Sequence, residues 1–174
     1  MKKLICVYLF ALVLVNSFAQ PGLSKGTSLL FKNNKSRLSQ AEKSTIFQLS
    51  GLTLSKDQKQ FAVKDEENVE YPFGAIAYNL DMNGDGKEEV FVVFGNSYTS
   101  GMTGSSVILF IKDAAGKYQS HLGFPSSTPS MLPFKSKGYP DLVMGGPGFE
   151  FPVWRWNGKR RRRAGSFIRQ INGC

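Results

Sequence analysis

The chain has 174 residues, of which 41% are hydrophobic, and its formal net charge of +9 comes from 22 Lys and Arg against 13 Asp and Glu. His121 is the single histidine, and the two cysteines, Cys6 and Cys174, stand near the two ends. This composition excludes a disulfide-rich scaffold and a catalytic site built from several histidines. Because residues 20–154 carry 13 basic and 13 acidic side chains, most of the surplus charge lies in the arginine-rich segment that follows them.

Residues 1–19 have the pattern of a secretory signal peptide. Two lysines precede a stretch of twelve apolar residues, 4–15, and Ser17 and Ala19 are the small side chains typical of a cleavage site. A membrane anchor is the alternative, but this stretch is shorter than the roughly 20 residues that cross a bilayer. We therefore expect cleavage after Ala19 and a secreted or periplasmic protein, with no transmembrane anchor after cleavage.

The next segment is predicted to contain one short helix. Residues 20–36 are mixed in polarity and rich in turn-forming residues, which is typical of a poorly ordered leader, with one short strand around 29–31. Ser39 and Glu42 have the spacing of a capping box, and a glycine ends the window that follows. These signals predict a helix over 40–50.

From Gly51 onward the pattern becomes that of an antiparallel β-sheet. Short apolar runs alternate with clusters of Gly, Pro, Asn, Asp and Ser, as strands and tight turns do in such proteins. The predicted strands are 75–80, 90–94, 107–111, 118–122, 141–144 and 153–156. The predicted fold class is mainly β, with α+β as the alternative, and the strands are propeller-blade-like. We expect a single domain over 37–158 and a basic C-terminal tail over 159–174.

The stretch DMNGDGKEE, which begins at Asp81, has the donor spacing of a calcium loop. Asp81, Asn83 and Asp85 alternate, a glycine at position six permits a sharp turn, Lys87 offers its carbonyl, and Glu89 completes the set. The three carboxylates among these donors, Asp81, Asp85 and Glu89, repel one another unless a cation neutralises them. The sequence therefore predicts calcium bound by these five residues, and the alternative is an Asx-rich turn without a metal.

These residues resemble the calcium loops of FG-GAP and VCBS-type repeats, the DxDxDGxxD strand-loop-strand elements of integrin-like propellers and many secreted bacterial proteins. The resemblance implies that the five residues hold the ion and that a strand, VFVVF (90–94), follows the loop. An EF-hand is excluded because its bidentate Glu would fall at Val92, inside this strand. Glu89 replaces the usual final Asp and no second complete loop exists, so the resemblance favours a metal loop more than a complete propeller.

One weak internal similarity relates 86–95 to 138–146. Both segments have a Gly, an acid three residues later and an apolar run closed by Gly, so that Glu89 corresponds to Asp141. Two copies are too few to close a propeller, and chance similarity is the alternative.

Catalytic motifs are scarce. His121 falls in a predicted strand without a cysteine partner, and glutamates such as Glu88 and Glu150 form no recognisable pair. The arginine run 160–163 has no interleaved aromatic residues, so we expect no nucleic-acid partner. The aromatic-rich segment 145–156 is either a ligand platform or a corner of the core.

The segment GNSYTSGMTGSS, 95–106, is longer than a hairpin requires, and such loops often bind partners. Tyr98 and Met102 are its candidate contact residues. We expect an exported, non-enzymatic, calcium-stabilised binding module that contacts an unknown protein or glycan of the cell envelope or extracellular space. An inhibitor or immunity-type protein is the more specific version of this prediction. The alternative is a secreted hydrolase that uses scattered carboxylates.

Overall fold

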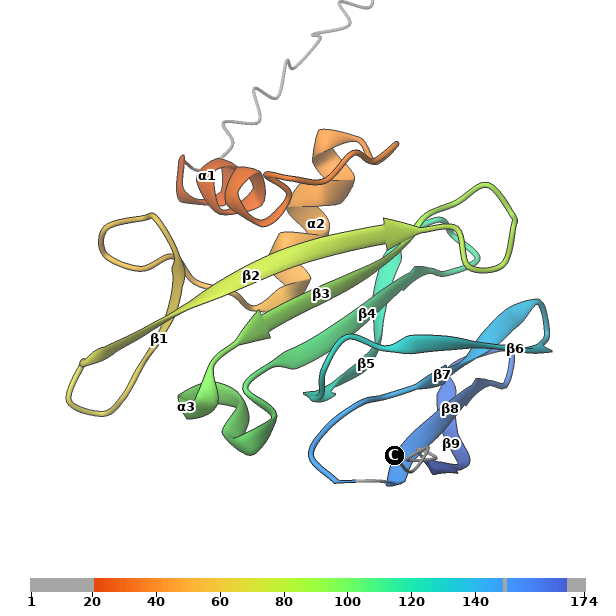
Figure 1. Ribbon diagram of the computed structural model, residues 1–174. Helices are drawn as coiled ribbons and strands as arrows, with labels where there is room; N and C mark the ends of the chain where they lie inside the picture. Colours follow the sequence, from red (N-terminus) through yellow and green to blue (C-terminus); the bar gives the residue numbers. More distant parts are fainter. Residues whose placement is uncertain (1–20, 149, 169–174) are drawn as a thin grey trace, which may run out of the picture.

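Nine strands form two antiparallel sheets within residues 21–148 and 150–168, the part of the chain that this computed structural model describes (Figure 1). The first sheet contains, in this order, β1 (Phe61–Lys64), β2 (Glu70–Leu80), β3 (Glu89–Gly95), β4 (Ser106–Lys112) and β5 (Tyr118–Pro125). The second sheet contains, in this order, β6 (Ser130–Ser136), β7 (Tyr139–Val143), β8 (Glu150–Trp156) and β9 (Arg161–Ile168). The predicted mainly-β, antiparallel fold is confirmed, and all six predicted strands overlap observed ones. The predicted signal peptide, 1–19, lies outside the described residues.

Three short helices and one 3-10 turn accompany the sheets. They are α1 (Pro21–Leu30), α2 (Gln40–Ser50), α3 (Ser97–Ser100) and η1 (Gly101–Thr103). The predicted helix corresponds to α2, and its capping box is present: the amide of Glu42 donates to the Ser39 hydroxyl, and the Ser39 amide donates to the Glu42 carboxylate. Gly51 ends α2 in the left-handed conformation, with φ of 68°.

The predicted leader over 20–36, with a short strand around 29–31, is wrong where the structure describes it, because Pro21–Leu30 form α1 and a turn follows over 31–33 in place of a strand. This helix has little intrinsic propensity, and most of its stability comes from packing, as is usual for short helices. Leu30 is buried against α2, and Gly26 allows the ring of Phe47 to lie directly on the α1 backbone, where a Cβ would clash. A local sequence pattern does not report such a tertiary contact.

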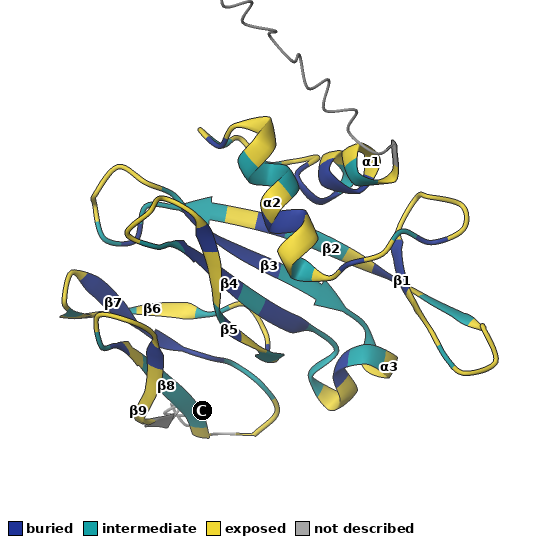
Figure 2. Cartoon of the chain, turned by 180° about the vertical axis from the view of Figure 1, so that it is seen from behind, coloured by how far each residue is buried: buried dark blue, intermediate teal, exposed yellow. Residues whose placement is uncertain are grey.

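The elements form three layers, with the first sheet in the middle. In Figure 1, α1 and α2 lie over one face of the first sheet, and the second sheet lies on the opposite side. Alternate residues of β3 serve the two interfaces: Val90 and Val92 pack with the helices, whereas Phe91 packs with Leu142 and Trp156 of the second sheet. Both faces of β3 and β4 are therefore covered, and Figure 2 shows their centre as buried. This arrangement explains the uninterrupted apolar run after the loop.

The predicted basic tail is also corrected, because its described part forms β9. This strand pairs with β8, and Arg161 lies opposite Trp156. The side chain of Arg161 is only 3% exposed, while the residues that follow it, 162–165, are exposed. The charge of this segment predicted a solvent-exposed terminus, but pairing with β8 makes the segment a strand of the second sheet. Among the described residues, none of the helices is long and apolar enough to span a membrane.

Candidate functional site

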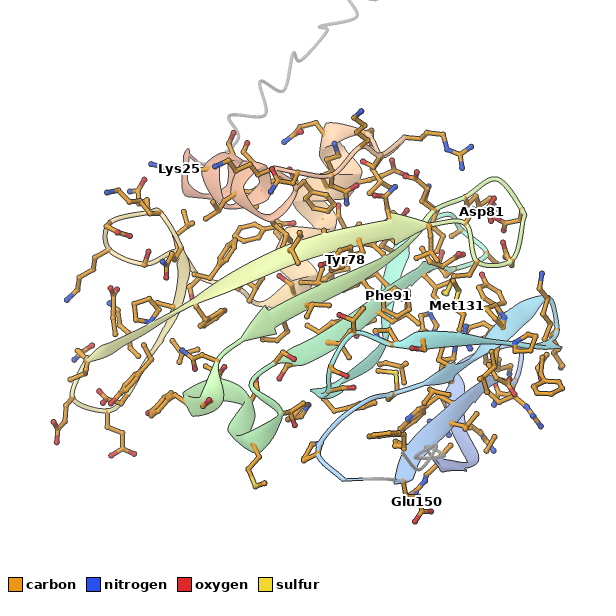
Figure 3. The ribbon with its side chains drawn as sticks, in the orientation of Figure 1. Lys25, Tyr78, Asp81, Phe91, Met131 and Glu150 are labelled. Carbon is orange, nitrogen blue, oxygen red and sulfur yellow. The ribbon has the colours of Figure 1, made fainter. Side chains whose placement is uncertain are left out.

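The candidate calcium loop connects β2 to β3 at one end of the first sheet. Leu80 and Glu89 form the last cross-strand pair before the loop, and Figure 3 shows Asp81 at its entrance. Gly84 and Gly86 have φ values of 81° and 82°, which side chains rarely adopt. The two glycines therefore permit the sharp curl that the sequence predicted.

Backbone amides fix the acidic side chains of the loop. The carboxylate of Asp81 accepts hydrogen bonds from the amides of Gly84, Asp85 and Gly86 at 2.7, 3.1 and 2.8 Å. Desolvation alone would raise the pKa of Asp81, but these three hydrogen bonds outweigh it and hold the pKa below its usual value. Asp81 therefore stays ionised and well oriented.

Asn83 and Asp85 are held in the same way. The side-chain oxygen of Asn83 accepts from the amide of Asp85 at 2.9 Å, and the carboxylate of Asp85 accepts from the amide of Lys87 at 2.8 Å. These bonds use part of the acceptor capacity of each oxygen, and the remaining lone pairs are available to a ligand.

Glu89 differs from the other acids because it is buried, with 2% of its surface exposed. One carboxylate oxygen accepts from the amide of Met82 at 2.8 Å, and the other accepts from the hydroxyl of Tyr139 at 3.0 Å. Burial raises the pKa of Glu89, these two hydrogen bonds oppose that rise, and the charges of Asp85 and Asp81 add to it. A negative charge on Glu89 is therefore costly as the site stands.

A comparison with Asp141 shows what Glu89 lacks. Asp141 is 1% exposed and forms an ion pair with Arg155, whose Nη2 lies 2.7 Å from its Oδ2. Within the described part of the chain, no ion pair involves Glu89. The two corresponding acids of the internal similarity thus have different environments, and Glu89 is the one without a cation.

The donor chemistry of the loop fits calcium in part. All five predicted donors are oxygens, as hard cations require, and no sulfur or imidazole competes. However, no three His, Cys, Asp or Glu side chains of residues 21–148 and 150–168 are gathered as metal ligands. Glu89 turns inward to Tyr139 while Asp81 faces the amides of the loop. Coordination by all five donors therefore requires the carboxylates to converge.

The second sheet touches the loop directly. Its turn between β6 and β7 contains Lys137 and Gly138, both with positive φ, and a Cβ at Gly138 would lie 4.0 Å from the Cβ of Asn83. Tyr139 follows this turn and reaches Glu89. Sequence reasoning missed Tyr139, because no local motif marks a residue that binds a loop 50 positions away.

The predicted partner-binding segment, 95–106, is a compact helical turn. The side chain of Asn96 accepts hydrogen bonds from the amides of Tyr98 and Thr99, and the buried hydroxyls of Ser100 and Ser106 lie 2.8 Å apart. On this framework Met102 is 91% exposed and Tyr98 is 55% exposed. The Tyr98 ring stacks on Tyr71 of β2, with the two centroids 3.6 Å apart.

The residues weighed for catalysis do not converge. Glu88 binds Asn79 and Arg37, and His121 packs edge-on against Trp156 with 5.1 Å between ring centroids. Figure 3 shows Glu150 far from Asp81. Glu150 lies at the end of the second sheet that is farther from the β2–β3 loop.

The aromatic-rich segment contributes to the core rather than to an open platform. Trp156 is buried beside Tyr139, with ring centroids 5.1 Å apart, and Trp154 stacks on Phe124 at 5.2 Å. Both contacts help to join the second sheet to the first.

Comparison with known protein families, curated proteins and solved structures finds no match to this chain. The resemblance of the loop to FG-GAP and VCBS-type repeats therefore stays a prediction that depends on the loop residues alone.

Proposed function

We propose that the protein is an exported, non-enzymatic binding module of the cell envelope or extracellular space, stabilised by calcium in the β2–β3 loop. Asp81, Asn83, Asp85, the carbonyl of Lys87 and Glu89 would hold the ion. One observation carries the proposal: Glu89 is a buried carboxylate near two further carboxylates, and none of the ion pairs among the described residues includes it. A divalent cation supplies the missing charge.

The role of calcium in this proposal is structural. The ion would neutralise the loop and tie β2 to β3 at the end where the second sheet also makes contact. Calcium sites of extracellular modules often have a Kd of about 10⁻⁴ to 10⁻³ M. At a Kd of about 10 μM, 1 mM calcium would add about 2.7 kcal/mol to the free energy of unfolding.

The test is a calcium titration of the secreted form by calorimetry, together with thermal melts in calcium and in chelator. We expect a saturable heat and a calcium-induced rise in Tm. Asp85→Asn should weaken both. The matched control is Asp113→Asn, because Asp113 accepts the same kind of amide hydrogen bonds in the β4–β5 turn without a set of neighbouring donors. Identical melts of the wild type in calcium and in chelator would refute the calcium site.

The binding role is supported by the surface at Tyr98 and Met102. Hydrogen bonds fix the backbone of this turn, so that binding would not have to order it, and the exposed Tyr98 and Met102 side chains offer apolar surface to bury. The test compares recovery of envelope or extracellular partners by the wild type with recovery by Tyr98→Ala and Met102→Ala. The control is Met131→Ala, which removes another exposed methionine, on β6. Equal recovery by all four proteins would exclude this turn as the contact surface.

A further inference from the structure

Arg161 is a buried cation with unused hydrogen-bonding capacity. Its Nη1 donates to the carbonyl of Pro140, but its Nε and Nη2 are buried and have no hydrogen-bond partner within 21–148 and 150–168. Burial lowers the pKa of Arg161 to about 10, so the guanidinium is still charged at neutral pH. An unpaired buried charge is costly, and it persists where something nearby compensates for it.

Tyr139 connects this cation to the buried anion of the loop. The guanidinium carbon of Arg161 lies 5.5 Å from the centroid of the Tyr139 ring, and the hydroxyl of the same tyrosine donates to Glu89. Among the neighbouring charges Asp141 acts most strongly on Arg161, followed by Tyr139 and Glu89, but Asp141 is shared with Arg155, with which it forms an ion pair. Glu89 and Arg161 are therefore two incompletely compensated charges on opposite ends of one side chain.

We propose that Arg161 is the internal counter-charge of the calcium loop: without the ion it balances Glu89 across Tyr139, and its positive charge sets how tightly the loop binds calcium. This inference rests on the proposed calcium site. A fixed positive charge close to the loop repels an incoming divalent cation, and the low polarity between the sheets reduces the screening of that repulsion.

The proposed role of Arg161 and a purely structural role predict opposite changes in calcium affinity when Arg161 is replaced. Removing the charge should tighten calcium binding, whereas most core substitutions weaken a neighbouring site. We expect Arg161→Met and Arg161→Gln to lower the Kd for calcium roughly tenfold. Arg161→Lys keeps the charge and should bind calcium like the wild type. The glutamine variant retains a donor for the Pro140 carbonyl, which protects against simple loss of folding.

The experiment is calcium calorimetry on the wild type and the three Arg161 variants, with melts in calcium and in chelator as the second readout. The control for net charge is Arg162→Met, one residue away on the exposed face of β9. It should change the affinity far less than the Arg161 neutral variants do. A charge-neutral variant that folds in calcium but not in chelator would also support the inference.

Three results would overturn the inference. One is a wild type that binds calcium, with Met, Gln and Lys at position 161 giving the same affinity; the proposed calcium site would then stand without it. Another is failure of both neutral variants to fold under either condition, because Arg161 would then be needed for the fold whatever the loop binds. A wild type without any calcium response would remove the proposed site itself, and the inference with it.

Discussion

Arg155 grips both carboxylate oxygens of Asp141 from the neighbouring strand, with Nε 3.2 and 3.0 Å from them and Nη2 2.7 Å from Oδ2. Asp141 is buried, whereas 53% of the Arg155 side chain is exposed. Arg155 therefore neutralises the buried carboxylate of Asp141 while about half of its own side chain stays in contact with solvent.

Replacing Arg155 with Met should lower the stability of the protein, because it removes the ion-pair partner of the buried Asp141 carboxylate. Breaking a buried pair by removing one partner is strongly destabilising, but the partial exposure of Arg155 reduces the effect. We expect the free energy of unfolding to fall by about 2 kcal/mol. Chemical denaturation measures this, with Arg162→Met as the control, since Arg162 is the exposed cross-strand neighbour. Equal stability of the two variants would contradict the assigned role.

Glu89→Gln should separate the charge of Glu89 from its hydrogen bonds. The amide side chain keeps an acceptor for the Met82 amide but removes the buried charge. We expect no rise in Tm when calcium is added. In chelator we expect only a small change in Tm, because the loss of the buried charge of Glu89 also leaves Arg161 without its counter-charge. A variant that melts well below the wild type in chelator would mean that the charge itself stabilises the calcium-free protein.

Glu42 should make the stability depend on pH in the acidic range. A hydrogen bond from Lys112 lowers the pKa of Glu42, burial opposes it, and bonds from Ser39 lower the pKa further. Because the folded-state pKa is below the unfolded one, this stabilisation is fully present above the unfolded pKa and is lost as pH falls through the folded pKa. The difference in Tm between the wild type and Glu42→Gln should therefore shrink as the pH falls below the ordinary carboxyl pKa of 4.5 and on through the lower folded-state pKa. Glu66→Gln, on an exposed loop, is the control for the loss of one acidic charge.

Leu30→Ala tests whether α1 is an integral part of the fold. Leu30 is fully buried against α2 and the first sheet, so truncation should lower the free energy of unfolding by about 2–5 kcal/mol. Leu49→Ala is the control, because Leu49 is an exposed leucine of α2 and its truncation should have little effect. If both variants unfold at the same denaturant concentration, α1 is not packed as described.

The elements that the sequence predicted correctly are those whose signals lie in neighbouring positions of the chain. The strands around Val92 and Leu109 were predicted because apolar runs between turn residues indicate strands, and α2 because its capping box is written in adjacent positions. In contrast, α1 depends on Phe47 packing against Gly26, and β9 depends on the burial of Arg161. Neither of these tertiary features produces a recognisable pattern in the neighbouring sequence.

For the candidate site, too, only the features written in neighbouring positions were predictable. The spacing of Asp81, Asn83 and Asp85 indicated the donors, and the structure places them on one glycine-rich turn. The burial of Glu89 and its contact with Tyr139 were not predictable, because both arise when the second sheet folds back against the loop.

The close approach of Gly138 to Asn83 limits how the molecule can be re-engineered or can diverge. Two hairpins from different sheets meet there, at the distance where a Cβ added to Gly138 would reach van der Waals contact with the Cβ of Asn83. An extra residue in either turn would push against the other, so changes in loop length at these two places must be compensated jointly. The Asp113–Lys117 turn has no such neighbour among the contacts described above, which makes it the better place to insert a tag or a grafted peptide.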